Sequence, residues 1–528
     1  MPCYANGIAM KKSICILAGL CLFAGAHADF TLTVLHTNDL HAHIEPSEVG
    51  RSTFGGYAKH ATLIKRSRTE DPNTILLNGG DTFQGTLYFT QYTGMADLSL
   101  MNVVGYDGMA VGNHEFDLGP DPLAQFAKHA TFPVLSANLD VSANRDLSTS
   151  IKPHAIKVIG GQKIGLIGAT TPDLPSISSP GPTVKLLALV PAIEKSIQAL
   201  RSEGVNKIIL LSHLGYDLEK EVARTCSGLD VIVGGHSHSY LGQATGISGF
   251  ASPHGPYPTV VESRESKVLL VSAWEWGKVL GRIKVLFDDD GKVESWSDAV
   301  PILVENSIPD DPTVASLVAA LSRPIESLRK TVVATTPYAL TRENSRIGNS
   351  NLGNLICDSM LDATQGSGTK LALMNNGGIR SNISQGPITF NEIIEVSPFG
   401  NTLVVLDLTG EELIKTLETG AARWGEDGRG VGIHVSRWAE VKYDVKRPPG
   451  KRVVSAKLNG EPIEKNRTYR VVVNSFMATG GDDFVTLRDA KGYRIDTGSL
   501  DRDAMIEFLK KFKGEDLTGT KRIEVVGS

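Results

Sequence analysis

The stretch TVLHTNDLHAHIEP, residues 33–46, decides how the chain can fold, because a strand pattern in it runs directly into residues that can bind metal ions. Apolar residues alternate with threonines over residues 30–34, which predicts a half-buried strand. Asp39, His41 and His43 follow as soon as the chain turns polar. A single Asp-x-His is common in ordinary turns, so its meaning depends on whether similar residues recur at other strand ends.

Similar residues do recur along the first half of the chain. From residue 29 to about residue 300, short apolar runs alternate with loops and helical patterns, which indicates an α/β fold. The runs ILLNGGD, MAVGNHEFD, IILLSHLG and VIVGGHSH end in Asp81, in Asn113 and His114, in His213, and in His236 and His238. Because loops from neighbouring strands converge at the carboxyl ends of an α/β sheet, we expect these side chains to meet at one point.

The residue types at these strand ends favour a site for two divalent metal ions. Carboxylate and amide oxygens combined with imidazoles suit zinc, manganese or iron, and one carboxylate can bridge a pair of ions. Two such ions about 4 Å apart activate water and clamp the oxygens of an in-line phosphoryl displacement. For His43, His60 and His254 we expect structural or surface roles instead.

Length and composition indicate an ordinary globular protein with more than one domain. The 528 residues exceed the size at which a single hydrophobic core keeps growing. With 41% hydrophobic residues, 21% charged residues and a net charge of -5, nothing suggests binding to a nucleic-acid polymer. After the N-terminal segment only Cys226 and Cys357 remain, in different halves of the chain, which excludes a disulfide framework.

The N-terminus has the pattern of a signal peptide over residues 1–28. Met10 and two lysines precede the apolar stretch SICILAGLCLFAGA, and the AHA that ends at Ala28 predicts signal-peptidase cleavage after that residue. The apolar run is short for a membrane span and no second one follows, so we expect no transmembrane segment in the mature chain. The pattern favours export to the periplasm, with surface retention and full secretion as alternatives.

The mature chain divides into two predicted domains and a connector. Residues 29–305 form the first α/β domain and end in strand patterns. Residues 306–335 have helical spacing and contain Pro324, which is expected to kink or end the helix, so they are the predicted linker helix and hinge. Residues 336–528 mix helical patterns with apolar strands and form the smaller second domain.

Loops of the second domain carry residues suited to an anionic and aromatic ligand. Arg342 and Arg346 lie in a polar loop, and Arg380 follows a glycine turn; guanidinium groups bind phosphate or carboxylate through paired hydrogen bonds. Phe399 and Phe476 stand beside turn residues, where each could stack on a nucleobase for about 1 to 3 kcal/mol. Taken singly, such residues also fit surface ion pairs and ordinary core packing.

Taken in order, the motifs resemble those of a known family. The blocks are Asp39-x-His41, Gly79-Gly80-Asp81, GNHEFD at 112–117, Ser212-His213 and Gly235-His236-Ser237-His238. They resemble the calcineurin-like metallophosphoesterases, and nearly all of the mature chain resembles the exported 5'-nucleotidase/UDP-sugar hydrolase family. This resemblance implies an N-terminal four-layer αββα sandwich, a linker helix and a smaller C-terminal α/β nucleotide-binding domain.

The resemblance also implies a role for each site residue. It assigns one ion to Asp39, His41, Asp81 and His238, and a second ion to Asp81, Asn113, His213 and His236. His114 would face the substrate phosphate, and Asp117 would orient it and favour its protonated form. Arg342, Arg346 and Arg380 would bind the anionic part of the substrate, Phe399 and Phe476 would stack on its base, and Asn375, Asn401 and Asp482 would contact base or ribose.

Three positions depart from the pattern of the family. His238 stands where several relatives have an amide side chain, which leaves the metal preference open. Asn376 replaces a glycine before GGIR, and Asp483 follows Asp482 where relatives often have glycine, which leaves the base preference open.

These observations lead to one leading functional hypothesis. We expect an exported, dinuclear-metal enzyme that releases nucleoside and phosphate from nucleoside 5'-monophosphates, with UDP-sugars, NAD and nucleoside di- and triphosphates as further substrates. The alternatives are a 2',3'-cyclic-nucleotide phosphodiesterase/3'-nucleotidase, a non-catalytic nucleotide- or zinc-binding protein, and a hydrolase of non-nucleotide esters. His114 and Asp117 argue against a pure binding protein, and the sequence does not indicate the oligomeric state.

Overall fold

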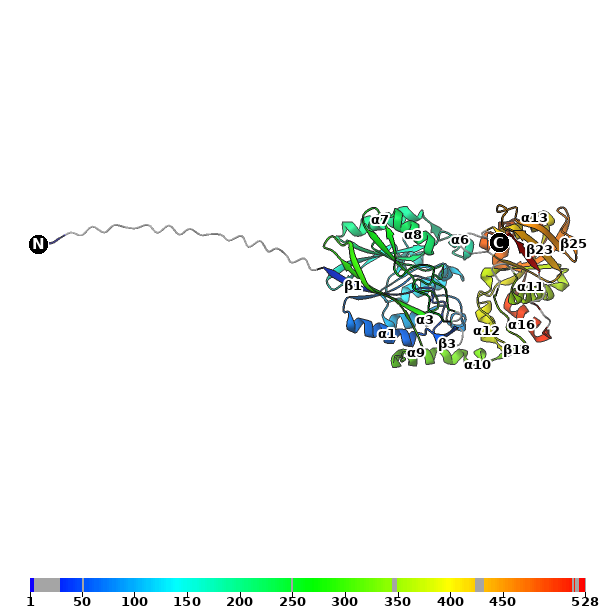
Figure 1. Cartoon of the computed structure of the whole chain (residues 1–528), viewed down its shortest axis with the longest axis horizontal. Helices are drawn as coiled ribbons and strands as arrows, with labels where there is room; N and C mark the ends of the chain where they lie inside the picture. The colour runs from blue at the N-terminus through cyan, green and yellow to red at the C-terminus, as the bar shows by residue number, and fades with distance from the viewer. Residues whose placement is uncertain are drawn as a thin grey trace.

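The chain folds into two α/β lobes joined by a helical connector along one side of the molecule (Figure 1). This computed structural model describes residues 1–3, 29–49, 52–247, 250–343, 349–422, 432–514, 517 and 522–527. The larger lobe begins at β1 and the smaller lobe contains the C-terminal elements. The predicted α/β fold class is confirmed.

Two β-sheets form the centre of the larger lobe. One sheet has the order β17-β16-β1-β4-β5-β6-β8 and the other the order β14-β15-β13-β12-β10-β9. The strands of the first are β1 (Phe30–Thr37), β4 (Thr74–Asn78), β5 (Gly108–Ala110), β6 (Val134–Leu135), β8 (Ile151–Lys152), β16 (Val279–Phe287) and β17 (Val293–Leu303). Those of the second are β9 (His154–Ile159), β10 (Gln162–Thr170), β12 (Lys207–His213), β13 (Val231–Val233), β14 (Thr259–Glu262) and β15 (Lys267–Val271).

The two sheets pack face to face through the alternating side chains of their strands. Leu32 and Val34 of β1 lie in one buried cluster with Leu166 of β10 and Leu211 of β12. Leu35, the next residue of β1, belongs instead to the cluster on the other face of its sheet. Successive side chains of β1 therefore point alternately into the core between the two sheets and into the core on the outer face of the first sheet.

Helices cover the outer face of each sheet. The first sheet is covered by α1 (Tyr57–Glu70), α3 (Met95–Val104) and α4 (Pro120–His129), and the second by α7 (Leu189–Ser202) and α8 (Tyr216–Thr225). The lobe is thus the four-layer αββα sandwich that the resemblance implied. Its shorter elements are β2 (Ser47–Val49), β3 (Ser52–Phe54), α2 (Leu87–Tyr92), η1 (His114–Phe116), β7 (Leu139–Asp140), α5 (Arg145–Ser150), α6 (Leu174–Ile177) and β11 (Lys185–Leu186).

Parallel pairing brings the functional strand ends to one edge of the sandwich. β1, β4 and β5 are parallel neighbours in the first sheet, and β10, β12, β13 and β15 are parallel neighbours in the second. The loops after these strands therefore leave the same edge, which faces the smaller lobe.

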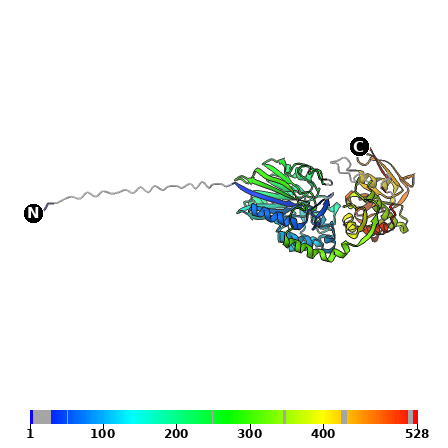
Figure 2. The same ribbon diagram turned by 60° about the horizontal axis from the view of Figure 1, so that its bottom comes forward.

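The connector consists of α9 (Pro312–Ser322), η2 (Arg323–Ile325) and α10 (Glu326–Arg329). The Asp311 carboxylate caps α9 by accepting hydrogen bonds from the backbone of Thr313 and Val314. The helix ends next to Pro324, which cannot donate the backbone hydrogen bond that an α-helix requires. α9 packs along α1, as Figures 1 and 2 show, so the connector is attached to the larger lobe over most of its length.

The smaller lobe is built on a mixed sheet with the order β22-β19-β26-β21-β27. These strands are β19 (Leu371–Asn375), β21 (Thr402–Thr409), β22 (Ile433–Val435), β26 (Thr468–Asn474) and β27 (Arg494–Leu500). A second sheet contains β23 (Ala439–Asp444), β24 (Val453–Leu458), β25 (Glu461–Pro462) and β28 (Ile523–Val526), and β18 (Val332–Thr336) pairs with β20 (Gly386–Thr389).

The smaller lobe also contains helices and short helical turns. They are α11 (Asn351–Ala363), α12 (Phe390–Val396), α13 (Gly410–Ala421), α14 (Ser475–Ala478), α15 (Val485–Asp489) and α16 (Asp501–Lys511), with the short turns η4 (Gln365–Ser367), η5 (Asn376–Gly378) and η6 (Gly481–Asp483). α12 and α13 both start with a capping box, formed by Thr389 with Glu392 and by Thr409 with Glu412. Across the described residues, we find no helix with the length and apolarity that a membrane crossing requires.

One buried ion pair joins the C-terminal strand to the rest of the smaller lobe. The Arg522 guanidinium, just before β28, donates to both carboxylate oxygens of Asp358 on α11, at 2.7 and 2.8 Å. The two side chains are 5% and 4% exposed. The same guanidinium also donates to the backbone oxygens of Asn354 and Val435.

Removal of this arginine should destabilise the smaller lobe strongly. We expect Arg522→Met to lower its free energy of unfolding by about 3 to 5 kcal/mol, because a buried carboxylate loses its partner. Lys442→Met is the control, since it breaks the more exposed pair with Glu524 between neighbouring strands and should cost less than about 1 kcal/mol. Equal losses for the two variants in urea denaturation would contradict this ranking.

Candidate dinuclear metal centre at the interface of the lobes

The predicted ligands come from five loops or strand ends at the edge of the sandwich. Asp39 and His41 follow β1, Asp81 follows β4, Asn113 follows β5, His213 ends β12, and His236 and His238 follow β13. Asp39, His41, Asp81, His236 and His238 all have positive φ angles, of 49°, 48°, 55°, 74° and 48°. Non-glycine residues rarely adopt this conformation, and such strain clusters at functional sites where the surrounding structure enforces it.

One group of ligand atoms surrounds Asn113. Its side-chain oxygen lies 3.1 Å from His213 Nε2 and 3.0 Å from His236 Nδ1. Asp81 Oδ2 lies 3.0 Å from the same His213 Nε2. The carboxylate of Asp81 thus completes this group from the neighbouring strand end.

A second group lies on the other side of Asp81. His238 Nε2 is 3.4 Å from Asp39 Oδ1 and 3.2 Å from His41 Nε2. His41 Nε2 is 3.9 Å from Asp81 Oδ2, so Asp81 borders both groups. In each of the acid and histidine clusters of the centre, the ligand atoms lie within 4.8 Å of one another.

The donor set fits divalent cations. Nε2 of His41 and Nε2 of His238 point at each other, and the other ring nitrogen of each is already engaged in a hydrogen bond, to the oxygen of Phe83 and to Glu275. Two imidazole nitrogens facing each other beside buried carboxylates are an arrangement that a shared cation stabilises. Mixed nitrogen and oxygen ligands suit zinc-like and manganese-like ions alike.

The carboxylates of the centre favour a positive charge on two of its histidines, whereas burial lowers the pKa of His41 and of His236. Burial lowers the pKa of His213, but the Asp81 and Asp39 carboxylates outweigh it and raise that pKa to about 10. Burial likewise opposes protonation of His238, and Asp39 together with Glu275 raises its pKa to about 9. Bound divalent ions would replace these protons, because metal ligands must be deprotonated.

His114 and Asp117 lie beside the ligands as a hydrogen-bonded pair. His114 Nδ1 donates to Asp117 Oδ2 at 2.6 Å, and Ser178 Oγ donates to the other carboxylate oxygen at 2.7 Å. Burial lowers the pKa of His114, but the charges of Asp117 and Asp81 outweigh it, so the net shift is upward. His114 Nε2 lies 3.9 Å from Asp81 Oδ2, at the border of the ligand cluster.

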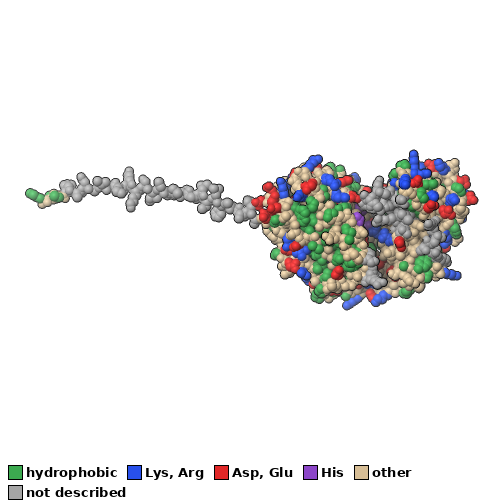
Figure 3. Space-filling model, in the orientation of Figure 1, with side chains coloured by type: hydrophobic (Ala, Val, Ile, Leu, Met, Phe, Trp, Pro, Cys, Tyr) green, Lys and Arg blue, Asp and Glu red, His purple; other side chains and the backbone are tan. Residues whose placement is uncertain are grey.

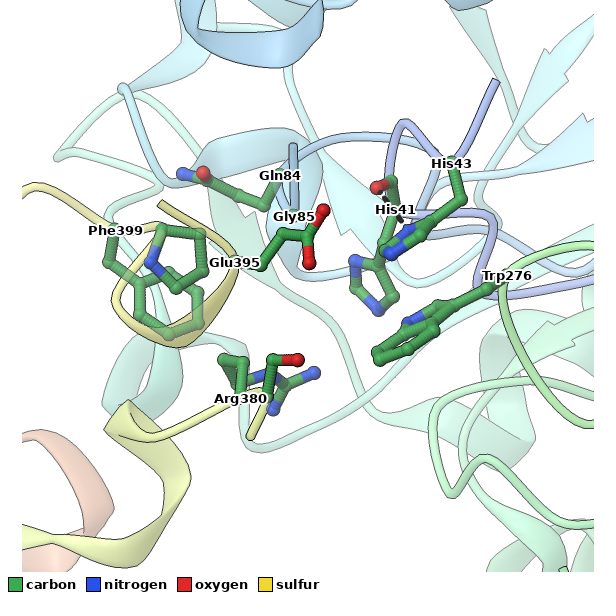
Figure 4. Close-up of a pocket in the computed structure, with 10 residues that line it drawn as sticks. His41, His43, Gln84, Gly85, Trp276, Arg380, Glu395 and Phe399 are labelled. Carbon is green, nitrogen blue, oxygen red and sulfur yellow. Dashed lines mark hydrogen bonds between the residues drawn. The ribbon is translucent and has the colours of Figure 1, made fainter. Parts of the chain in front are cut away.

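A narrow cleft lies beside this centre, between the two lobes. The larger lobe lines it with His41, His43, Gln84, Gly85 and Trp276, and the smaller lobe with Arg380, Ser381, Glu395, Pro398 and Phe399 (Figure 4). Histidine and basic side chains are visible in the groove between the lobes in Figure 3. The Phe399 ring stacks on His114 at 5.5 Å between centroids, with 16° between the planes.

The predicted residues of the smaller lobe that the structure describes form three small groups. Arg342 Nη1 donates to the backbone oxygen of Arg380 at 2.9 Å, and the Arg380 guanidinium lies 5.8 Å from the centre of the Phe399 ring. Asn375 Nδ2 donates to Asp482 Oδ2 at 2.6 Å. Ser475, the neighbour of Phe476, donates to the Asn401 side chain at 3.3 Å. Arg346 lies outside the described residues.

Two buried or partly buried carboxylates beside the centre were not predicted from the sequence. Glu115 is fully buried and accepts backbone hydrogen bonds from Asp81, Thr82, Phe83 and Gly112, at 3.1, 2.7, 3.2 and 2.7 Å. It therefore fixes the loop that carries Asp81, and its place inside the GNHEFD block was the available signal. Glu275 contacts His238 and follows the carboxyl end of β15, another strand end of the second sheet.

Comparison with known proteins agrees with this arrangement. The family model described as calcineurin-like phosphoesterase matches residues 32–240, and the one described as 5'-nucleotidase, C-terminal domain, matches residues 331–489. A 5'-nucleotidase of Diplobatis ommata is 35% identical over 95% of this chain and 91% of its own length. The chain belongs to the 5'-nucleotidase family. The resemblance inferred from the motifs is confirmed, and this family member is a hydrolase with a metallophosphoesterase domain.

Solved structures of other family members have the same fold. The 5'-nucleotidase precursor from Thermus thermophilus is 44% identical, with a TM-score of 0.90 over 94% of this chain and 100% of that one. The NAD nucleotidase of Haemophilus influenzae is 27% identical, with a TM-score of 0.59 over 95% of this chain and 100% of that one. The two-lobed arrangement of this 5'-nucleotidase family member is therefore shared along nearly the whole chain.

Replacement of Asp81 should remove metal from both halves of the centre. Asp81→Asn keeps the shape but removes the charge that borders both ligand groups, so we expect metal affinity to fall by more than the roughly 10- to 100-fold that loss of an outer hydrogen-bond partner costs. Metal content by mass spectrometry and calorimetric titration would measure it. Asp217→Asn, which removes the same charge from an exposed pair with Lys220, is the control. Undiminished metal binding in Asp81→Asn would contradict the shared role of this carboxylate.

Proposed function

We propose that this protein is an exported, metal-dependent 5'-nucleotidase that hydrolyses nucleoside 5'-monophosphates to nucleoside and phosphate. The observation that carries the proposal is the cleft between the lobes, where His41 of the ligand cluster lies across from Arg380 and Phe399, and the Phe399 ring stacks on His114. Metal ligands with a protonated imidazole suit a phosphate ester, and an arginine beside an aromatic ring suits a nucleotide. The signal-peptide pattern before residue 29 supports export.

Two divalent ions, zinc or manganese, would be held by the two ligand groups. Asp39, His41, Asp81 and His238 would hold one, and Asp81, Asn113, His213 and His236 the other. When bound, the ions would supply Lewis-acid activation of water and of the phosphoryl oxygens.

His114 would act on the substrate phosphate. Its Nδ1 is fixed by Asp117, and Asp117 is fixed in turn by Ser178, so the ring cannot turn away from the ligand cluster. The upward pKa shift favours the protonated ring, from which Nε2 can donate to a phosphoryl oxygen or to the leaving 5'-oxygen.

The smaller lobe would bind the nucleoside part of the substrate. Arg342, Arg346 and Arg380 would bind its anionic groups, Phe399 and Phe476 would stack on the base, and Asn375, Asn401 and Asp482 would contact base or ribose. Because the Phe399 ring lies on His114, a substrate must separate these two rings to reach the centre. We place the hinge for this opening in residues 306–335, where α10 ends at Arg329 and β18 begins at Val332.

Phosphate release from 5'-AMP tests the proposal, with 3'-AMP in parallel, in the presence of manganese or zinc and again after chelation. We expect metal-dependent release from the 5' ester alone. Release only from the 3' ester would replace the proposal by the 3'-nucleotidase alternative, and no release from metal-loaded protein would favour a binding protein or a hydrolase of other esters. The similarity to the NAD nucleotidase makes NAD the next substrate to test.

His114→Ala should separate metal binding from turnover. We expect the variant to keep its metal content and to lose at least about 100-fold in kcat on 5'-AMP, since it removes a positioned proton donor but no assigned ligand. Metal analysis and steady-state kinetics on the same sample measure both quantities. Turnover close to that of the unmodified protein would rule out the assigned role.

Phe476→Ala should weaken nucleotide binding specifically. We expect KM for 5'-AMP to rise by about 5- to 150-fold, the range that corresponds to a stacking contribution of about 1 to 3 kcal/mol, and KM for a small aryl phosphate to change little. Phe476→Tyr is the matched control because it keeps the aromatic face. Equal losses on both substrates would contradict stacking on the base.

A further inference from the structure

The loop that follows β15 supports one half of the metal centre. Its residues Trp274 and Trp276 have positive φ angles of 61° and 59°. The Trp276 backbone N–H donates to the backbone oxygen of Asp39 at 2.7 Å. The side-chain amide of Asn38 donates to the backbone oxygen of Trp274 at 2.6 Å. This loop is therefore bonded directly to the segment that carries Asp39, and it adopts a strained backbone to reach it.

Glu275, between the two tryptophans, contacts His238. His238 Nδ1 donates to Glu275 Oε2 at 2.6 Å, and Lys278 Nζ donates to Glu275 Oε1 at 2.9 Å. Both carboxylate oxygens are thus engaged, one by the imidazole and one by the ammonium group. A carboxylate held in this way fixes both the rotation of the imidazole and the position of its proton.

Lys278 is itself held between two indole rings. Its side chain is 4% exposed, and Nζ lies 4.3 Å from the Trp274 ring centroid and 3.8 Å from the Trp276 centroid. His43 stacks on Trp276 at 4.1 Å, with 6° between the planes, next to His41 in Figure 4. Cation–π contacts on both sides leave the ammonium group little freedom, so it anchors Glu275.

The other ligand histidines with a fixed ring have neutral partners. His213 Nδ1 donates to the Gly79 backbone oxygen at 2.8 Å, and His41 Nδ1 donates to the Phe83 backbone oxygen at 2.9 Å. Among the described residues, His238 is the ligand histidine whose outer ring nitrogen is paired with a carboxylate. An anionic partner makes an imidazole a stronger donor than a carbonyl does, so the two halves of the centre are chemically different.

We propose that Glu275 is a positioning residue for His238, that Lys278 held between Trp274 and Trp276 keeps it in place, and that this arrangement strengthens metal binding selectively in the Asp39, His41 and His238 half of the centre. The inference rests on the metal site of the proposed function. It deepens that function by assigning the difference between the two ion sites to a loop outside the ligand set.

Zinc titration of the metal-free mature protein tests the proposal without any measurement of activity. We expect the unmodified protein to bind two zinc ions in competition with a chromogenic chelator, and Glu275→Gln to weaken one of them by about 10- to 100-fold while the other changes less than about threefold. Lys278→Met, which leaves the contact between Glu275 and His238 but removes its anchor, should weaken the same ion by a smaller factor.

A double-mutant cycle separates positioning from general support of the loop. In a His238→Ala background, Glu275→Gln should change the affinity for the same zinc ion less than about threefold, because the imidazole that Glu275 positions is absent. A loss in that background as large as in the unmodified protein would overturn the proposal, and so would equal weakening of both ions. If Glu275→Gln does not fold, Lys278→Met in the two backgrounds gives the same comparison. Unmodified protein that binds neither zinc nor manganese would overturn the proposed function and this inference together.

Discussion

The position of one carboxylate, that of Asp81, determines how the rest of the centre is arranged. It is 1% exposed and lies between two ligand groups, and its other oxygen accepts the backbone N–H of His114. A buried carboxylate requires compensating charges and hydrogen bonds. The close approach also requires glycine at position 112, where a Cβ atom would come within 2.2 Å of the Asp81 oxygen. The contacts of this one carboxylate therefore fix the positions of residues from both sheets.

Many of the strained backbone conformations lie in the loops at this edge of the sandwich, and the buried strands next to these loops stabilise them. Five of the proposed ligands have positive φ angles, and the next loop adds two tryptophans in the same conformation. The strands that carry them are almost entirely buried: every residue of β4 and β12 is in the interior. Rigid strands on one side and a charge-rich cleft on the other allow the strained loops to persist, because the apolar core between the sheets supplies the stability that the loops lack.

The sequence predicted best those site residues that directly follow a strand. The residues after β1, β4, β5, β12 and β13 could be placed together because parallel strands end at a common edge. Contacts between distant loops could not be predicted from the sequence. Glu115 joins the turns after two strands, Glu275 reaches a histidine 37 residues away, and Phe399 meets His114 across the lobes. No periodicity encodes such contacts, since they depend on how loops pack after the strands are in place.

The path of the chain between the lobes has an evolutionary consequence. In the described part of the chain, every strand before the connector pairs within the larger lobe and every strand from Val332 onward pairs within the smaller one, so the backbone crosses between them in a single short segment. A recombination event at this point would exchange a complete C-terminal lobe without interrupting any strand of either lobe. The metal-ligand residues of the larger lobe and the residues with which the smaller lobe lines the cleft can therefore be inherited separately.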